Sequence, residues 1–225
     1  MTGPPPRFTI ATGFPDAQRG AVARLFWDAF SDKLGRLLRP EAQALRFIEE
    51  ALVPHFALSA LDPEGQVLGI AGIKTEAGGL LTAGYRDLQK VYGHAGALWR
   101  GPLLDLTERR LEPGQLLMDG IFVAAQARGQ GVGQALLREV LAEAARRGCR
   151  EVRLDVIDRN ARARALYERM GFVAVGEERM GLLRYVFGFA RSTTMVCAID
   201  REGRSVERAG DAAEQHERPR GPGVR

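Results

Sequence analysis

The segment from Arg128 to Gly133 is the part of this 225-residue sequence whose composition most clearly suggests chemistry. It reads Arg-Gly-Gln-Gly-Val-Gly and lies between a predicted strand and a predicted helix. Its three glycines leave the main chain bare, so that a ligand can approach the N–H groups closely. The start of a helix also carries partial positive charge, which favours phosphate. The segment therefore predicts a phosphate or pyrophosphate site, although its bare pattern, Arg/Gln-x-x-Gly-x-Gly/Ala, is expected about once by chance in such a chain.

Two other glycine-loop motifs are excluded by single residues. A dinucleotide fingerprint, Gly-x-Gly-x-x-Gly, would need glycine where the chain has Gln134 or Leu136. A P-loop would need a Gly-Lys-Ser/Thr ending, which does not occur after these glycines. The glycine pattern alone therefore does not identify a function, and the residues that follow it must be considered with it.

Those residues form a second motif. After the predicted strand at 151–157 come Asn160, then Tyr167, and then Gly171-Phe172. Taken with the glycine turn, the stretch from Leu116 to Phe172 resembles the GCN5-related N-acetyltransferase (GNAT) superfamily. The acetyl-CoA motif of that family is this turn, and its next motif has an asparagine and then a tyrosine before Gly-Phe. The resemblance covers about 60 residues strongly and the order of elements from Phe8 to Ile199 more loosely.

The resemblance implies acetyl-CoA as the cofactor and gives several residues a role. Main-chain groups at the end of the preceding strand would pair with the pantetheine arm like an added strand, and amides of the turn would bind the CoA pyrophosphate. The strand residues are Ile121, Phe122 and Val123, and the turn residues are Arg128, Gly129, Gln130, Gly131, Val132, Gly133 and Gln134.

The resemblance also places Asn160 against the pantetheine and directs the hydroxyl of Tyr167 at the thioester sulfur. Each residue has a simpler interpretation as well. Asn160 is a good helix N-cap, and Tyr167 could be a half-buried helix residue that packs by its ring. As an acid, a phenol with a pKa of about 10 can supply a proton to the leaving thiolate.

A general base is needed too, because an alkylamine with a pKa near 10.4 is almost entirely protonated at physiological pH. Asp119 is the candidate. It alternates with Ile121 and Val123, so the three are expected to share one face of the strand unless a bulge intervenes. Leu117 stands where some relatives carry glutamate. A solvated or hydrogen-bonded strand residue is an equally good interpretation of Asp119, and Glu177 and Glu178 are weaker candidates.

The elements that would position these residues follow from the hydrophobic periodicity. The order predicts an α/β fold, and the resemblance implies a GNAT-like, mostly antiparallel sheet of about seven strands, flanked by helices, with a splayed central parallel pair. Strands are predicted at 8–11, 56–61, 67–73, 116–124, 151–157, 172–175 and 193–199. Helices are predicted from Pro15, from Pro40, at 132–147 and at 158–170. The insert, about residues 80–112 between the third and fourth strands, is expected to hold two helices broken at Gly101-Pro102.

The acceptor site is expected at the first two helices, the insert and the last strands. Phe26, Trp27 and Phe30 could line it, although the helical spacing of Phe26 and Phe30 favours core packing. Asp28 and Asp32 could attract a cationic amine or form a wet helix face. In the insert, His94, Tyr92 and Trp99 could cap the acceptor or form a dimer contact.

Composition excludes several classes of function. The formal charge is +4, and the 32 basic residues are interleaved with 28 acidic ones, so a nucleic-acid partner is not expected. Two cysteines without CxxC spacing and three isolated histidines predict neither a disulfide framework nor a metal site. No run of apolar residues is long enough for a membrane span, so we expect no membrane partner and a cytoplasmic location. A single domain over residues 1–200 and a mobile charged tail over 201–225 are predicted.

These observations favour an acetyl-CoA-dependent N-acetyltransferase that acts on the primary amine of a small molecule or peptide. A homodimer is one assembly that the sequence allows. Two alternatives stay open. One is acetylation of peptide or protein N-termini, which would need an open groove, whereas the insert favours a closed site. The other is a non-catalytic acyl-CoA-binding regulatory module, which would tolerate loss of Tyr167.

Overall fold

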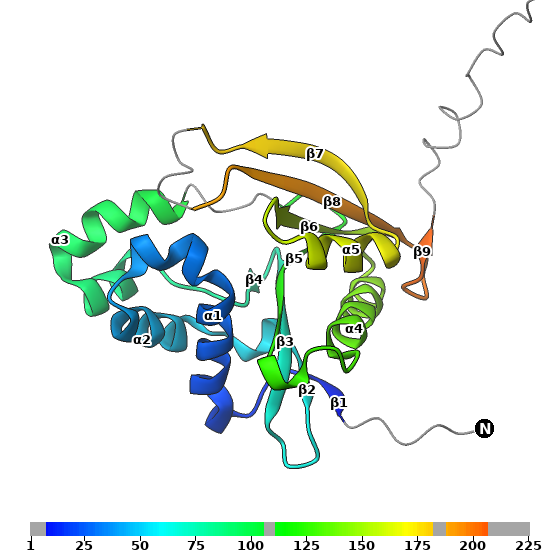
Figure 1. Cartoon of the computed structure of the whole chain (residues 1–225), viewed down its shortest axis with the longest axis horizontal. Coiled ribbons are helices and arrows are strands. Elements are labelled where there is room, and N and C mark those ends of the chain that lie inside the picture. Colours follow the sequence, from blue (N-terminus) through cyan, green and yellow to red (C-terminus); the bar gives the residue numbers. More distant parts are fainter. Residues whose placement is uncertain (1–7, 106–110, 182–187, 207–225) are drawn as a thin grey trace, which may run out of the picture.

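The computed structural model describes residues 8–105, 111–181 and 188–206, and it is built around one sheet (Figure 1). Seven strands run in the spatial order β1-β2-β3-β5-β6-β8-β7, while β4 pairs with β3 and β9 with β8. All pairs are antiparallel except β5 and β6. The strands are β1 (Thr9–Thr12), β2 (Ala57–Leu61), β3 (Val67–Thr75), β4 (Gly78–Gly79), β5 (Gln115–Val123), β6 (Glu151–Ile157), β7 (Val173–Arg179), β8 (Arg191–Ile199) and β9 (Ser205–Val206).

Helices cover both faces of the sheet, as the predicted α/β class requires. They are α1 (Arg19–Leu38), α2 (Glu41–Ala51), α3 (Tyr85–Asp105), α4 (Val132–Arg146) and α5 (Ala161–Arg169). In Figure 1, α1, α2 and α3 lie to the left of the central strands and α4 and α5 to their right. The mostly antiparallel sheet and its helical flanks confirm the predicted fold class.

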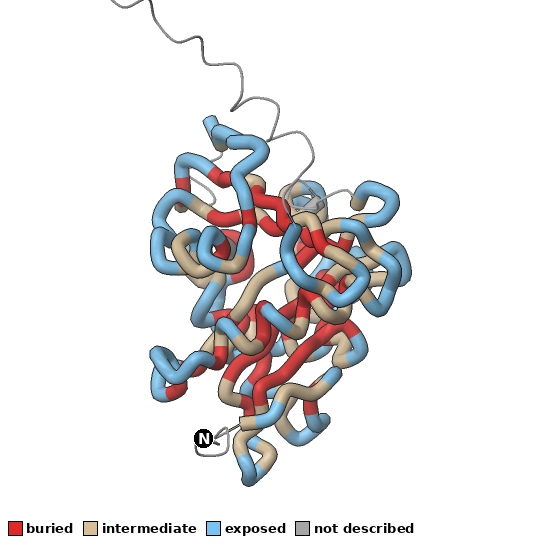
Figure 2. The backbone as a smooth tube through the Cα atoms, turned by 90° about the vertical axis from the view of Figure 1, so that its right-hand side faces the viewer, coloured by how far each residue is buried: buried red, intermediate tan, exposed pale blue. Residues whose placement is uncertain are grey.

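Each face has its own hydrophobic core. Buried residues of α4, among them Leu136, Leu137 and Val140, pack with β5, β6 and β8. On the other face, Val22 and Phe26 of α1 pack with residues of α2, α3, β2 and β3. Figure 2 shows the buried segments running through the central strands, with exposed turns around them. Alternate residues of a strand point to opposite faces, so each central strand is fixed from both sides.

The insert forms a helix interrupted by a glycine. Gly93, in the left-handed region with φ of 68°, breaks α3 into two helical parts, as the two predicted helices require. The predicted break at Gly101-Pro102 is wrong, because the second part runs through Pro102. Gly93 is the better break point because glycine adopts positive φ without steric cost.

Both parts of α3 are fastened to the end of α1, the first by Tyr92 and the second by Arg100. The guanidinium of Arg100 donates hydrogen bonds to the carbonyl oxygens of Leu37 (2.8 Å) and Arg39 (3.2 Å), and the hydroxyl of Tyr92 donates to Leu38 (2.7 Å). A cation is favoured at a helix C-terminus, where the last carbonyls lack helical partners. Arg100 also stacks on the rings of Tyr92 and Trp99, each 4.2 Å away. Two of the aromatic residues of the insert, Tyr92 and Trp99, therefore take part in this attachment.

The described chain continues past Asp200, where the sequence predicted the fold to end. Asp200 accepts hydrogen bonds from the amides of Glu202 and Arg204, and the resulting turn leads into β9. A Cβ built on Gly203 would lie 2.8 Å from Ala142 of α4, so the turn packs closely on that helix. Residues 207–225 of the predicted tail lie outside the described residues. Among the described helices, none combines the length and the apolar character that a bilayer crossing requires.

The Arg100 attachment predicts a loss of stability on Arg100→Met. Carbonyls at the end of α1 would lose charged donors, and we expect the free energy of unfolding to fall by about 1–3 kcal/mol. The measurement is urea denaturation followed by circular dichroism. Arg86→Met, at an exposed position at the start of the same helix, is the matched control and should change the free energy by less than about 0.5 kcal/mol. Equal losses in the two variants would contradict the attachment.

Candidate functional site

The glycine turn presents a row of unused amides at the start of α4. Gly129 and Gly131 have φ of 80° and 82°, and Gly131 is the N-cap residue, with no side chain capping the helix. Within the described chain, the amide N–H groups from Gly129 to Gln134 donate no hydrogen bond. The first amides of a helix lack helical partners, so these groups form an anion-binding surface. The turn therefore has the geometry that the sequence predicted for a phosphate site.

Arg128 differs from the rest of the turn. Its amide already donates to the carbonyl of Ala125 at 3.3 Å, closing a short 3-10 turn over Ala125–Ala127. Its side-chain Nε donates to the carbonyl of Val123 at 3.2 Å. Arg128 thus braces the end of β5 against the turn with its side chain, and its amide, which was expected to bind the pyrophosphate, is already used within the turn.

The glycines at 129 and 131 are needed for conformation. A Cβ at either position would meet nothing within 4 Å, whereas any L-residue at these φ values is strained. At Gly133 the surroundings are closer, because a Cβ there would lie 3.7 Å from Leu166 of α5 and 3.8 Å from Val123 of β5. The end of β5, the start of α4 and the second half of α5 therefore meet at Gly133.

The gap expected between the two parallel strands lies beside this meeting point. β5 and β6 pair only from Gln115 with Glu151 to Met118 with Leu154. Beyond Met118, β5 stays paired with β3 up to Val123, and β6 stays paired with β8 up to Ile157. The two strand edges that face each other across the gap thus carry main-chain groups without a ladder partner. Ile121, Phe122 and Val123 supply such an edge, in the place predicted for the pantetheine.

A bulge interrupts β5 where the strands part. Gly120 is in register with Gly72 and Met118 with Ile73, so Asp119 is the extra residue. A Cβ on Gly72 would lie 3.4 Å from Asp119 and closer still to Leu80, which belongs to the core under α1, α2 and α3. Asp119 therefore faces that side of the sheet.

The bulge corrects the expectation that Asp119 shares a face with Ile121 and Val123. Those two side chains pack against the core under α4, so the extra residue has turned the carboxylate to the other face. A Cβ on Gly79 would lie 3.6 Å from Oδ2 of Asp119 and 3.3 Å from Cγ of Lys74, so that both side chains flank Gly79. Asp119 is exposed, and it lies on the side of the sheet that packs against α1, α2 and α3.

Tyr167 is the buried member of the site. Its side chain packs in the core under α4, and its ring centroid lies 5.9 Å from that of Phe172. Burial raises the pKa of Tyr167 to about 12, because a phenolate would lose its hydration. The phenol is therefore protonated at any physiological pH and can act as a donor.

Asn160 is a helix N-cap, which is the simpler of its two predicted roles. Its Oδ1 accepts a hydrogen bond from the amide of Ala163 at 3.2 Å, at the start of α5. Its side-chain amide group donates no hydrogen bond to other described residues. Capping and ligand contact are thus compatible, because they use different atoms of the same side chain.

The aromatic residues of α1 pack mainly in the core. Phe26 and Trp27 are buried, and Phe26, Phe30 and Phe122 form a cluster with ring centroids 4.6 to 5.4 Å apart. Phe122 thus ties β5 to α1 through its side chain. Asp28 is exposed, and the side chain of Asp32 is not among those that the structure describes.

The other candidates stand apart from the gap. Glu177 lies on β7, an edge strand that is separated from β6 by β8. Its carboxylate forms an ion pair with Arg191 of β8 at 3.5 Å. Glu178 lies on the same edge strand. His94 is exposed and contacts Gln89 through Nδ1 at 3.0 Å. None of these three residues adjoins the diverging ends of β5 and β6.

A polar group on β6 was missed by the sequence reasoning. Val152, Leu154 and Val156 point into the core under α4, so Arg153 and Asp155 point to the face that Asp119 shares. Asp155 accepts a hydrogen bond from the hydroxyl of Thr194 at 2.6 Å. The signal was the alternation of charged and apolar residues within 151–157, which places charges on a face beside the gap.

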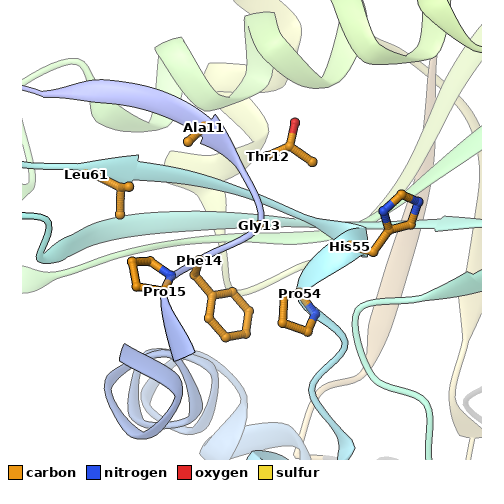
Figure 3. Close-up of a pocket in the computed structure, with 8 residues that line it drawn as sticks. All are labelled: Ala11, Thr12, Gly13, Phe14, Pro15, Pro54, His55 and Leu61. Carbon is orange, nitrogen blue, oxygen red and sulfur yellow. The ribbon is translucent and has the colours of Figure 1, made fainter. Parts of the chain in front are cut away.

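The hollow drawn in Figure 3 lies away from all of these residues. Its volume is about 490 Å³, and it is lined by β1, by the start of the chain toward α1 and by the turn around Pro54 and His55. No predicted site residue lines it. Among the described residues, no group of three or more His, Cys, Asp or Glu side chains could hold a metal ion.

Comparisons with known proteins agree with this geometry. A model of the Acetyltransferase (GNAT) family matches residues 20–172. N-acetyltransferase 8 of Homo sapiens is 40% identical over 91 residues, which make up 40% of this chain and 37% of that protein. Thialysine N-epsilon-acetyltransferase of Bos taurus is 38% identical over 56 residues, 25% of this chain and 33% of that protein. Each match thus spans less than two fifths of the relative.

The fold has solved counterparts as well. A GCN5-related N-acetyltransferase from Kribbella flavida superposes with a TM-score of 0.58 and 20% sequence identity, over 87% of this chain and all of that one. At this level of identity, the likeness concerns the shared fold.

The burial of Tyr167 predicts a spectroscopic result. A phenol with the ordinary pKa of about 10 would be half ionised at pH 10, whereas Tyr167 should reach half ionisation only near pH 12. We expect the wild type and Tyr167→Phe to show the same rise in phenolate absorbance up to pH 11. The free energy of unfolding should then fall as the pH rises from about 10 toward 12, because the phenol of Tyr167 ionises at a lower pH in the unfolded chain than in the folded protein. A larger rise in the wild type, by half of one phenolate at pH 10, would contradict the burial.

Proposed function

Because this chain belongs to the acetyltransferase (GNAT) family, we propose that it transfers the acetyl group of acetyl-CoA to a primary amine by direct attack on the thioester. The observation that carries the proposal is the coincidence of the unused amides of Gly129 to Gln134 with the unpaired edge of β5. The first can hold a diphosphate, and the second can hold an amide-bearing arm.

The residues present fit acetyl-CoA in two independent ways. The start of α4 offers N–H donors and the positive end of the helix dipole to the pyrophosphate. The edge of β5 from Gly120 to Val123 offers peptide groups that pair as a strand would, and Asn160 has an amide group left to donate. The cofactor would supply an acetyl group activated as a thioester.

The chain's own contribution is placement and proton transfer. Holding the amine and the acetyl carbon in contact converts a bimolecular reaction into an intramolecular one. A main-chain N–H of Ile121 to Val123 would receive the negative charge that develops on the acetyl oxygen. Asp119, on the opposite face of the gap from α4, would accept the proton of the amine directly or through water.

Tyr167 would donate to the departing sulfur. With a pKa of about 12, the phenol is a weaker acid than an ordinary thiol, whose pKa is about 8.5. Full transfer of its proton to the thiolate is therefore unfavourable, even when the sulfur carries its whole negative charge. We assign Tyr167 the role of a hydrogen-bond donor that stabilises the negative charge on the leaving sulfur.

Cofactor binding is tested by thermal unfolding with acetyl-CoA. Binding at 100 times Kd should stabilise the wild type by about 2.7 kcal/mol. Gly131→Val should abolish that shift, because a side chain at φ of 82° displaces the turn. Gly148→Val is the matched control: Gly148 ends the same helix, has φ of 72° and has nothing within 4 Å of a Cβ. It should lose similar intrinsic stability and keep the cofactor shift. An equal shift in both variants would show that the turn does not bind the cofactor.

Catalysis is tested with Tyr167→Phe, which keeps the ring contact with Phe172 and removes the hydroxyl. The shift with acetyl-CoA should persist, while kcat should fall about 100-fold, the lower end of general-acid contributions, because the phenol is a weak acid. The measurement is thiol release from acetyl-CoA with a panel of amines, together with an acetyl mass increment on the product. Unchanged turnover would remove Tyr167 from the mechanism. A non-catalytic binding module would show the shift and no thiol release in either protein.

A further inference from the structure

Arg153 stands out among the partly buried arginines because its guanidinium forms no hydrogen bond with any described residue. Its side chain is 22% exposed, and its Nε is buried without a partner. Its nearest acidic atom is Oδ1 of Asp155, 3.9 Å from Nη2, which is beyond hydrogen-bonding distance. The oxygen that it approaches already accepts from Thr194.

Two other arginines whose side chains are similarly exposed donate hydrogen bonds. Arg19, 27% exposed, donates to Asp16 and to the carbonyls of Glu49 and Leu52. Arg147, 26% exposed, donates to Glu143. A buried donor left unsatisfied costs free energy, and such a group in a native structure calls for an explanation.

The neighbours of Arg153 provide no counter-ion across the sheet. Its register partners are Leu117 on β5 and Val196 on β8, both buried and apolar. The pair Leu117 and Arg153 is the second-last rung before β5 and β6 part, and the last is Met118 with Leu154. Arg153 therefore lies at the closed end of the gap, on the same face as Asp119.

The charged residues on this face form two rows across the strands: Arg153 lies in the first row, and Asp119 and Asp155 lie in the second. Asp119 follows Leu117 by two residues on β5, and Asp155 follows Arg153 by two residues on β6, so the two carboxylates flank the point where the strands diverge. Two residues of a strand span about 7 Å, so one molecule can reach both rows. The two carboxylates favour a cationic amine at the gap, and the guanidinium favours an anion beside it.

We propose that Arg153 is a specificity residue that binds a carboxylate of the acceptor, so that the acceptor is a free amino acid or a similar small zwitterion. The inference rests on the proposed acetyl transfer and names its acceptor class. A planar carboxylate matches the fork of a guanidinium in a bidentate pair. A protein N-terminus carries no carboxylate of its own next to the reacting amine, so Arg153 favours free amino acids over that class.

The test compares amino acids with their amides, for example lysine with lysinamide and alanine with alaninamide, as acceptors. For each pair, the ratio of kcat/KM for the acid to that for the amide is measured in the wild type and in Arg153→Gln. We expect the ratio to fall about 10- to 100-fold in the variant, as a charged hydrogen-bonded pair is lost. Differences in amine pKa between acid and amide cancel, because the same compounds are used with both proteins.

Two further variants make the result specific. Arg191→Gln, on the neighbouring strand β8 with an exposed side chain paired to Glu177, should leave the ratio unchanged. Arg153→Lys keeps the charge without the fork and should give an intermediate ratio. An unchanged ratio in Arg153→Gln, with acid and amide reduced together, would overturn the proposal.

The test of Arg153 can fail or succeed independently of the test of cofactor binding and acetyl transfer. Shifts of the melting temperature with acetyl-CoA should be equal in the wild type and Arg153→Gln, because Arg153 lies on the opposite face from α4. If no amine is acetylated, titration calorimetry of the acid and amide against the protein decides the matter. Tighter binding of the acid that disappears in Arg153→Gln supports the carboxylate site, and equal binding of acid and amide overturns it.

Discussion

The separation of β5 and β6 is the constraint on which the rest of the molecule depends. Every non-proline residue carries a main-chain donor and acceptor that must find partners, so a sheet opens in its middle only if each strand is held from its outer side. Here β3 holds β5, and β8 holds β6, beyond the last shared rung at Met118 and Leu154. The inner edges are then left to a ligand, or to water before the ligand arrives.

The two hydrophobic cores make this opening stable. Ile121 and Val123 fix the end of β5 toward α4, while Phe122 fixes the same stretch toward α1 through contacts with Phe26 and Phe30. The strand is thus held from both faces where it has lost one neighbour in the sheet. The bulge at Asp119 marks the change of direction and places a carboxylate on the face of the sheet that packs against α1, α2 and α3. Cofactor and acceptor would in this way approach the gap from opposite faces of one sheet.

Much of this architecture was predictable from the sequence, because local patterns determine it. The apolar stripe of α4 and the glycines before and after it define that helix, and the strand predicted at 151–157 matches β6. The fold class followed from the order of elements and from a family resemblance carried by Gly129 to Gly133, Asn160 and Tyr167. The anion-binding character of the turn also follows from local geometry, since it needs only glycines at positive φ and a helix start.

What escaped prediction depends on contacts distant in the sequence. Alternation along β5 could not reveal the bulge, which arises from how Gly72 and Ile73 of β3 pair with it. The break at Gly93 competed with Gly101-Pro102, and the contacts of Arg100 with the end of α1 explain why the helix persists there. Arg153 went unnoticed because an arginine in a strand is unremarkable until its neighbours are known to be Leu117 and Val196.

The attachment of α3 to α1 uses main-chain oxygens of residues 37–39 as its acceptors. Peptide carbonyls are the same whatever side chain they carry, so this joint places no demand on the identity of those three residues beyond their packing. The side-chain donors of this joint are Arg100 and Tyr92. Substitutions at residues 37–39 that keep the backbone and the buried packing of Leu37 and Leu38 should therefore leave the joint intact.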